Sequence, residues 1–237
     1  MATILHIETA TQLCSVALSK DGQVISFRES DEKNAHSRVL TTFIEELQAE
    51  AGIEIAAIDA VAVSMGPGSY TGLRIGVSTA KGLCYALGKP LISVSTLQAM
   101  AYGMRKTLKP GTGQKTEKII FCPMIDARRM EVYTALYDFS LNMIGQINAM
   151  IIDENAFSDY FVNHHLVFAG DGSDKCADLF QDTKKATWLR GFNASSTFMI
   201  EFAENKFLKK EFENVAYFEP FYLKDFIAGI PRVKGLA

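Results

Sequence analysis

Two acidic residues stand at matching places in the two halves of the chain, and both could take part in nucleotide chemistry. Glu8 ends the first apolar run, and Asp126 ends a similar run in the second half. Carboxylates at such positions can hold a hydrated magnesium ion. A glycine-flanked aspartate further along could approach a nucleoside. The candidate degenerate nucleotide site comprises Glu8, Thr9, Asp126, Gly170, Asp171 and Gly172.

The turns that follow the two carboxylates argue against tight phosphate binding. Residues 9–12 read Thr-Ala-Thr-Gln and residues 127–130 read Ala-Arg-Arg-Met, so neither turn contains glycine. Turns that wrap phosphate with backbone amides usually need glycine for the close approach. Two interpretations therefore stay open: a degenerate nucleotide site, or an inherited cleft with no ligand of its own.

The histidines and cysteines do not have the spacing of a metal site. Two imidazoles four residues apart on a helix can share one metal ion, but the residue four after His36 is Leu40. His164 and His165 are adjacent and point to different faces of any regular element. The four cysteines are far apart and include no C-x-x-C pair. We therefore expect no metal, no cofactor and no disulfide.

Composition and charge exclude several classes of protein. Hydrophobic residues make up 48% of the chain and charged residues 22%, which is typical of a globular protein with a packed core. The formal net charge of -3 gives no basic footprint for a stand-alone nucleic-acid binder. We see no signal peptide and no run of about 18 apolar residues. The sequence thus predicts a cytoplasmic protein with no membrane contact.

A glycine-rich turn at residues 66–72 is the most specific local feature. A predicted strand at 60–65 enters it and a predicted helix at 70–87 leaves it, with Ser69 as the helix N-cap. The turn matches neither a Walker A loop nor a dinucleotide-binding fingerprint. Within the helix, Gly72, Gly76 and Ala80 recur every four residues. Interior glycines cost about 1 kcal/mol each relative to alanine, so we expect another backbone, from this chain or a partner, to approach this face.

The remaining elements repeat across the chain and predict two lobes. A three-stranded meander at 3–27 returns at 119–152, and each is followed by helices and further strands. Helices are expected at 36–50, 70–87 and from Ser95 through 105 in the first half. In the second half they are expected at 154–163, 173–180 and 195–210. The predicted boundaries are 1–107 and 108–237, joined by the glycine-containing segment 106–118. This order predicts an α/β fold of the actin/hexokinase/Hsp70 (ASKHA, ribonuclease-H-like) type with two duplicated lobes.

One motif gives the chain a specific resemblance. Residues 66–76 read Gly-Pro-Gly-Ser-Tyr-Thr-Gly-Leu-Arg-Ile-Gly and resemble the GPGSFTGxRIG signature of the TsaB (YeaZ) family, with Tyr70 where phenylalanine is common. Residues 4–10, 91–97 and 220–224 are also similar to that family, although Lys224 stands where arginine is frequent. The resemblance covers essentially the whole chain and is strongest over residues 3–100.

The resemblance implies a partner role in the synthesis of threonylcarbamoyladenosine in tRNA. It implies pairing with TsaD, the catalytic subunit, together with the small ATPase TsaE, with tRNA met only through the complex. TsaD-type proteins carry a His-x-x-x-His metal pair, of which only His36 is present here. We therefore expect no catalytic residue in this chain, and a homodimer when it is isolated. The predicted interface comprises His36, Val39, Leu40, Phe43, Gly72, Leu73, Gly76, Val77 and Ala80.

The alternative hypothesis is an independent enzyme. A stand-alone ATPase or sugar-type kinase of the same fold would use the carboxylates of the candidate nucleotide site. A degenerate glycoprotease-like enzyme is a weaker variant, because no G-x-S-x-G nucleophile motif occurs in the sequence.

Overall fold

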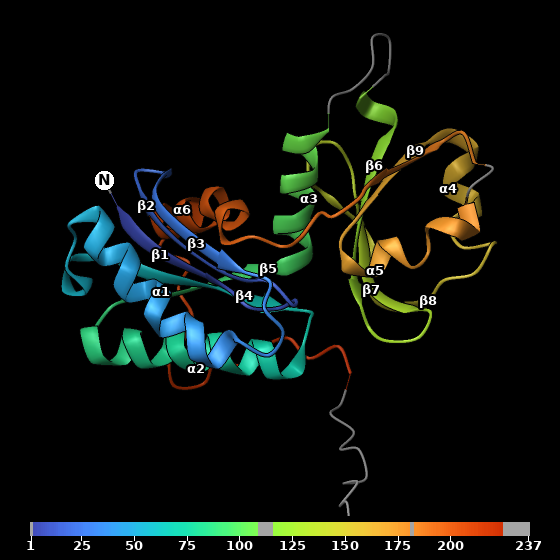
Figure 1. Cartoon of the computed structure of the whole chain (residues 1–237). Coiled ribbons are helices and arrows are strands. Elements are labelled where there is room, and N and C mark those ends of the chain that lie inside the picture. Colours follow the sequence, from blue (N-terminus) through green and yellow to red (C-terminus); the bar gives the residue numbers. More distant parts are fainter. Residues whose placement is uncertain (1, 109–115, 181–182, 225–237) are drawn as a thin grey trace, which may run out of the picture.

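The chain folds into two lobes, each built on a five-stranded sheet (Figure 1). The computed structural model describes residues 2–108, 116–180 and 183–224. The strand order is β3-β2-β1-β4-β5 in the first sheet and β10-β9-β6-β7-β8 in the second. In both sheets the central strand pairs antiparallel with the first strand of a two-stranded hairpin on one side and parallel with one strand on the other, and a further parallel strand pairs with that one. This shared topology confirms the predicted duplication and the α/β fold class.

The first sheet is covered by helices on both faces, and its central strand is therefore completely buried. Its strands are β1 (Thr3–Glu8), β2 (Cys14–Lys20), β3 (Gln23–Ser30), β4 (Ala60–Gly66) and β5 (Leu91–Ser95). Leu5 and Ile7 point toward the face with α1 (His36–Ala51) and α2 (Tyr70–Leu87). Ile4 points toward the face with α3 (Thr96–Thr107) and α6 (Ile200–Lys209). The strict alternation along β1 follows from the two-residue period of a strand.

The predicted helix starts and ends in the first lobe are confirmed by local chemistry. Ser69 caps α2 by accepting a hydrogen bond from the Gly72 amide at 3.2 Å, and Ser95 accepts from the Gln98 amide at the start of α3. Gly52 and Gly88 end α1 and α2 in the left-handed conformation. A short 3-10 helix, η1 (Ile55–Ala57), leads into β4.

The second lobe has a smaller helical cover and an aromatic core. Phe168 stacks on Trp188 with ring centroids 4.9 Å apart and on Phe180 at 5.8 Å. The strand β10, which carries Trp188, was not predicted, because four residues are too short for a periodic signal. The strands are β6 (Ile119–Asp126), β7 (Glu131–Tyr137), β8 (Met143–Ile151), β9 (His165–Ala169) and β10 (Ala186–Leu189).

The helices predicted in the second half need correction. The helix expected at 154–163 begins only at Ser158. The preceding residue, Phe157, is left-handed (φ 67°), and residues 153–155 form a turn in which the Asn155 amide donates a hydrogen bond to the Asp153 carboxylate. The segment 173–180 is two short pieces, α5 (Asp171–Asp174) and η3 (Ala177–Phe180). The segment 195–210 is η4 (Ser196–Met199) followed directly by α6, and η2 (Thr116–Lys118) precedes β6. Of the predicted connection 106–118, residues 109–115 lie outside the described residues.

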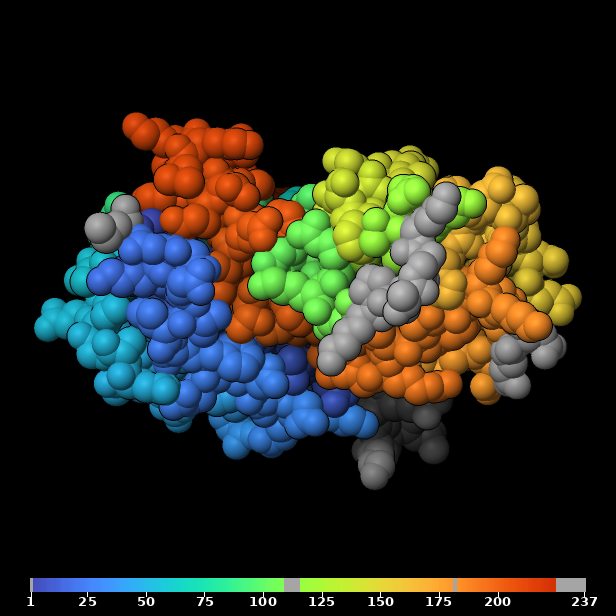
Figure 2. All heavy atoms as spheres, turned by 90° about the horizontal axis from the view of Figure 1, so that it is seen from above, coloured from blue at the N-terminus to red at the C-terminus, as the bar shows by residue number. Residues whose placement is uncertain are grey.

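The helix α6, which comes after the second-lobe strands in the described part of the chain, belongs by its contacts to the first lobe. Met199 and Ala203 pack with Ile4, Ala60 and Ile92 in one buried cluster. Seen from above, the red C-terminal segment lies against the blue first lobe (Figure 2). The boundaries 1–107 and 108–237 stay a prediction based on chain order; by packing, η4 and α6 return to the first sheet.

Two further findings concern the chain as a whole. No helix in the described ranges is both long enough and apolar enough to cross a lipid bilayer. The four cysteines are free and buried, and burial raises the pKa of the Cys122 thiol to about 12, so each acts as a small apolar side chain.

Candidate functional site

The glycine face of α2 lies against the turn that follows β1 in this same chain. The Ser69 amide donates to the Ala10 carbonyl at 2.7 Å. A side chain at Gly72 would run into the Thr9 carbonyl, and one at Gly76 would meet the Thr9 hydroxyl. Gly72 is therefore needed for close approach of the chain's own backbone, and Gly76 for close approach of the Thr9 side chain. The expectation that they meet a partner protein is wrong, since their space is already filled.

Most of the predicted interface residues are buried inside the first lobe. Leu40, Val77 and Ala80 belong to the core beneath the sheet, and only Val39 and Phe43 are half-buried with some surface free. The buried members cannot touch a partner directly; they are His36, Leu40, Gly72, Leu73, Gly76, Val77 and Ala80. Of the predicted interface residues, only Val39 and Phe43 have surface left for a partner. The prediction that α1 and α2 carry the interface is unaffected.

A second row of small residues on α2 faces outward. Ser78, Gly82 and Ala86 recur every four residues and are exposed, and a Cβ atom added at Gly82 would have no atom of the described residues within 4 Å. Gly82 and Tyr85 line an apolar hollow of about 600 Å³ against residues 214–216. The signal for this row is present in the sequence as a second four-residue spacing on the opposite side of the helix, and our sequence reasoning missed it.

A cleft of about 810 Å³ opens between the lobes. On the first-lobe side it is lined by the β1–β2 turn and by the starts of α1 and α2. Asp126, Arg128 and Asp171 line it from the second lobe, and Lys33 adds a second cation. The size is within the range of small-molecule sites, so the cleft can accommodate a ligand.

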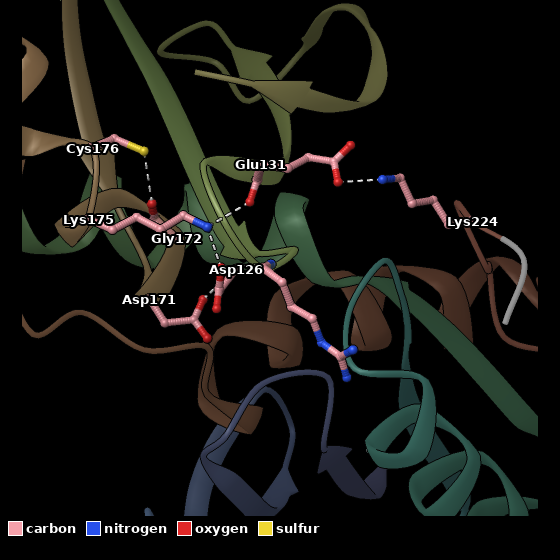
Figure 3. A network of polar contacts seen from close by, with 8 residues as sticks. Asp126, Glu131, Asp171, Gly172, Lys175, Cys176 and Lys224 are labelled. Atoms are coloured by element: carbon pink, nitrogen blue, oxygen red, sulfur yellow. Dashed lines mark hydrogen bonds and ion pairs between the residues drawn. The ribbon is translucent and has the colours of Figure 1, made fainter. Parts of the chain in front are cut away.

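The acidic groups of the second lobe are held by a local network (Figure 3). One Asp171 oxygen accepts from the Asp126 amide at 2.9 Å, and the Asp126 carboxylate forms an ion pair with Lys175. Burial, reinforced by the Asp126 charge, raises the pKa of the Asp171 carboxyl above its ordinary value. The structure thus brings Asp126 and Asp171 together at the cleft, as the candidate nucleotide site requires.

The other members of that candidate site do not reach the cleft. Glu8 is fully buried, and its Oε1 atom accepts a hydrogen bond from the Ala10 amide at 2.7 Å. Burial raises the pKa of Glu8 to about 7, which disfavours the charged carboxylate that a magnesium ion needs. Side chains at Gly170 and Gly172 would collide with the backbone of β6, so these glycines serve packing.

His36 is also committed to the fold. It is 9% exposed, and its Nε2 atom lies 3.0 Å from the Thr11 carbonyl, which fixes the start of α1 against the β1–β2 turn. Across the described ranges, no three His, Cys, Asp or Glu side chains come together in a way that could hold a metal ion. His36 is therefore a structural residue in this chain.

Comparisons with known proteins identify the family. The family model described as "TsaD: tRNA N6-adenosine threonylcarbamoyltransferase" matches residues 30–232. A protein of Buchnera aphidicola named tRNA threonylcarbamoyladenosine biosynthesis protein TsaB is 32% identical over 68% of this chain and 69% of its own length. The chain belongs to the TsaB (YeaZ) family. A TsaB of Haemophilus influenzae is 26% identical over 94% of both chains, and that of Escherichia coli is 38% identical over 60% of this chain and 57% of its own length.

Solved structures support the fold of this TsaB-family chain. YeaZ from Pseudomonas aeruginosa superposes with a TM-score of 0.72 at 24% identity, covering 94% of this chain and all of that one. The ethanolamine utilization protein EutJ of Carboxydothermus hydrogenoformans superposes with a TM-score of 0.53 at 7% identity, covering 85% of this chain and 90% of that one. At these identities the likeness concerns the fold alone, which is the predicted ASKHA-like fold.

A matched pair of glycine substitutions tests the packing of α2. Gly72→Ala should lower the free energy of unfolding by about 1–3 kcal/mol, because the new methyl group collides with the Thr9 carbonyl. Gly82→Ala should raise it by about 0.5–1 kcal/mol, because the site is open and alanine favours the helix. Urea denaturation of both variants measures this. Equal effects would contradict the assignment of the buried face.

The raised pKa of Glu8 predicts a pH dependence of stability. Between pH 4.5 and pH 7 the unfolded chain releases the Glu8 proton while the folded chain keeps it, so the folded state loses stability as the pH rises. A shift of this size amounts to about 3 kcal/mol. Glu8→Gln carries no such titrating group. The free energy of unfolding of the variant minus that of the wild type should therefore increase from pH 4.5 to pH 7.

The comparison of variant and wild type removes the contribution of His6. Burial lowers the pKa of His6 to about 3. This group therefore lowers the free energy of unfolding as the pH falls below 6.5, whereas Glu8 lowers it as the pH rises. Both proteins contain His6, and its effect cancels in the difference. Denaturation curves at several pH values give the result, and a difference that stays constant from pH 4.5 to pH 8 would rule out a buried neutral Glu8.

Proposed function

We propose that this chain is the non-catalytic subunit of the tRNA N6-threonylcarbamoyladenosine synthase, and that it dimerises with and supports a TsaD-type catalytic subunit. The observation that carries the proposal is membership of the family whose named relatives are tRNA threonylcarbamoyladenosine biosynthesis proteins. A TsaE-type ATPase would join the complex, and this chain would meet tRNA only through the complex. A cytoplasmic location follows from this role in tRNA modification.

The outer surface of α1 and α2 is our candidate for the partner contact. The exposed row Ser78, Gly82 and Ala86 would let a foreign helix approach closely, because these side chains add little bulk. Val39 and Phe43 of the neighbouring helix offer apolar contact beside it. A specific interface of about 1,600 Å² in total would cover both helices. The same patch could pair with itself, which is the basis for a homodimer in isolation.

The internal chemistry of the chain favours support over catalysis. The imidazole that corresponds to one metal ligand of TsaD-type proteins is tied to the Thr11 carbonyl, and the next position of the pair is the buried Leu40. Glu8, the carboxylate at the end of β1, is buried away from the cleft and favoured in its neutral form. We infer that the reacting groups belong to the partner, whose geometry this chain stabilises.

A bulky substitution on α2 tests the proposed surface. Gly82→Trp should abolish co-elution with a TsaD-type subunit, because the indole fills the space that a partner helix needs. The free energy of unfolding of the isolated chain should change by no more than about 0.5 kcal/mol, because the position is open. Gln146→Trp, on the exposed strand β8 of the other lobe, is the matched control and should co-elute normally. Normal co-elution of Gly82→Trp would exclude this face.

The cleft is the basis for a second candidate function, that of an independent ATPase or kinase. Its volume and the pair Asp126 and Asp171 favour this idea. The buried Glu8 and the packed glycines at 170 and 172 oppose it. Calorimetry of the isolated chain with ATP and magnesium separates the two functions. We expect no micromolar binding and no turnover, whereas turnover that is lost in Asp171→Asn would favour the enzyme.

A further inference from the structure

The C-terminal strap, residues 214–224, runs along the outside of α2 and then reaches the other lobe. Phe218 is buried in the first-lobe core, and Lys81 of α2 donates to the Phe218 carbonyl at 2.9 Å and to the Ala216 carbonyl at 3.2 Å. These contacts attach residues 216–218 of the strap beside Lys81. From there the strap continues toward the N-terminus of α2.

The end of the strap is fixed at the first turn of α2. The Phe221 amide donates to the Met65 carbonyl at 2.7 Å, and a side chain at Gly66 would come within 2.8 Å of the Phe221 carbonyl. The ring of Tyr222 packs on that of Tyr70 with centroids 4.8 Å apart. Aromatic contacts of this geometry add to the stability beyond the area they bury.

Lys224 carries the strap across to the second lobe. It forms an ion pair with the Glu131 carboxylate, as Figure 3 shows. The carbonyl of the same Glu131 accepts from Lys175 at 2.7 Å and from the Ala127 amide at 3.1 Å. Lys224 thus holds the base of the turn 126–131, which supplies Asp126 and Arg128 to the cleft wall.

The turn 126–131 has an unusual backbone conformation, which depends on the contacts around it. Arg128 and Arg129 both have positive φ angles, 72° and 52°. Two successive non-glycine residues in the left-handed region are held there by the contacts around them. The Glu131 amide donates to the Arg128 carbonyl at 3.1 Å, so the residue that receives Lys224 also closes the turn.

We propose that residues 220–224 act as an inter-lobe latch that sets the width of the cleft. The Tyr222 ring fixes one end of the latch on α2, and the Lys224–Glu131 ion pair fixes the other end on the cleft wall of the second lobe. The lobes also meet through α3, whose Leu97 and Met100 pack with Phe121 of the second sheet, so the latch restricts the motion that this contact still allows. An exposed ion pair is weak enough to open and close, so the latch limits this motion and does not abolish it. The latch does not depend on the proposed partner.

Distance measurements in the isolated full chain test the latch. Nitroxide labels at Glu45→Cys on α1 and Gln146→Cys on β8 report the separation of the lobes by electron–electron double resonance. The four native cysteines are buried, so the labels attach selectively. Lys224→Glu and Glu131→Lys should each raise the ratio of open to closed molecules about two- to fivefold, the range expected for one exposed ion pair.

Two comparisons make the result specific. The double variant Lys224→Glu with Glu131→Lys restores opposite charges and should return the distance distribution to that of the wild type. Tyr222→Ala should widen the distribution, whereas Tyr217→Ala, in the same strap but 83% exposed, should not. Unchanged distances in both single charge variants, or no recovery in the double variant, would overturn the latch. Neither result would bear on co-elution with a TsaD-type subunit, which the Gly82→Trp variant tests separately.

Discussion

The close contact between the β1–β2 turn and the glycine face of α2 is the constraint on which the rest of the structure depends. Gly72 lets the helix lie directly on the Thr9 carbonyl, Gly76 makes room for the Thr9 side chain, and the Ser69–Ala10 hydrogen bond sets the starting point of the helix. With the helix held so closely, its first turn forms one side of the cleft and its opposite row of small residues faces outward. The contact of α2 with the β1–β2 turn therefore determines the position of both the cleft and the candidate partner surface.

The two halves of the duplicated fold have diverged in how they use their acidic residues. In the first half the carboxylate is enclosed, and burial favours its neutral form. In the second half Asp126 remains at the surface of the cleft and is balanced by Lys175. A symmetrical fold has thus become chemically asymmetrical, with the first lobe specialised for packing and the second lobe retaining polar groups that a ligand could meet.

Local periodic signals predicted most of the fold, while the neighbours of each face could not be predicted. The helices at 36–50 and 70–87 were found because apolar residues recur at helical spacing and Ser69 supplies a cap. A glycine spacing indicates close approach but does not identify the approaching chain, and the placement of Gly72 and Gly76 in a partner interface rests on the family resemblance alone. Likewise, the pattern of residues 195–210 predicts helical structure but contains no information on which lobe it covers.

The return of α6 to the first sheet has a consequence for synthesis on the ribosome. The sheet face that includes Ile4, Ala60 and Ile92 is covered in part by Ala99 of α3 and completed by Met199 and Ala203. The nascent first lobe must therefore keep part of this apolar face uncovered while nearly the whole second lobe is translated. Association of this face with chaperones, or with other nascent chains, would compete with native folding until the last helix has emerged from the exit tunnel.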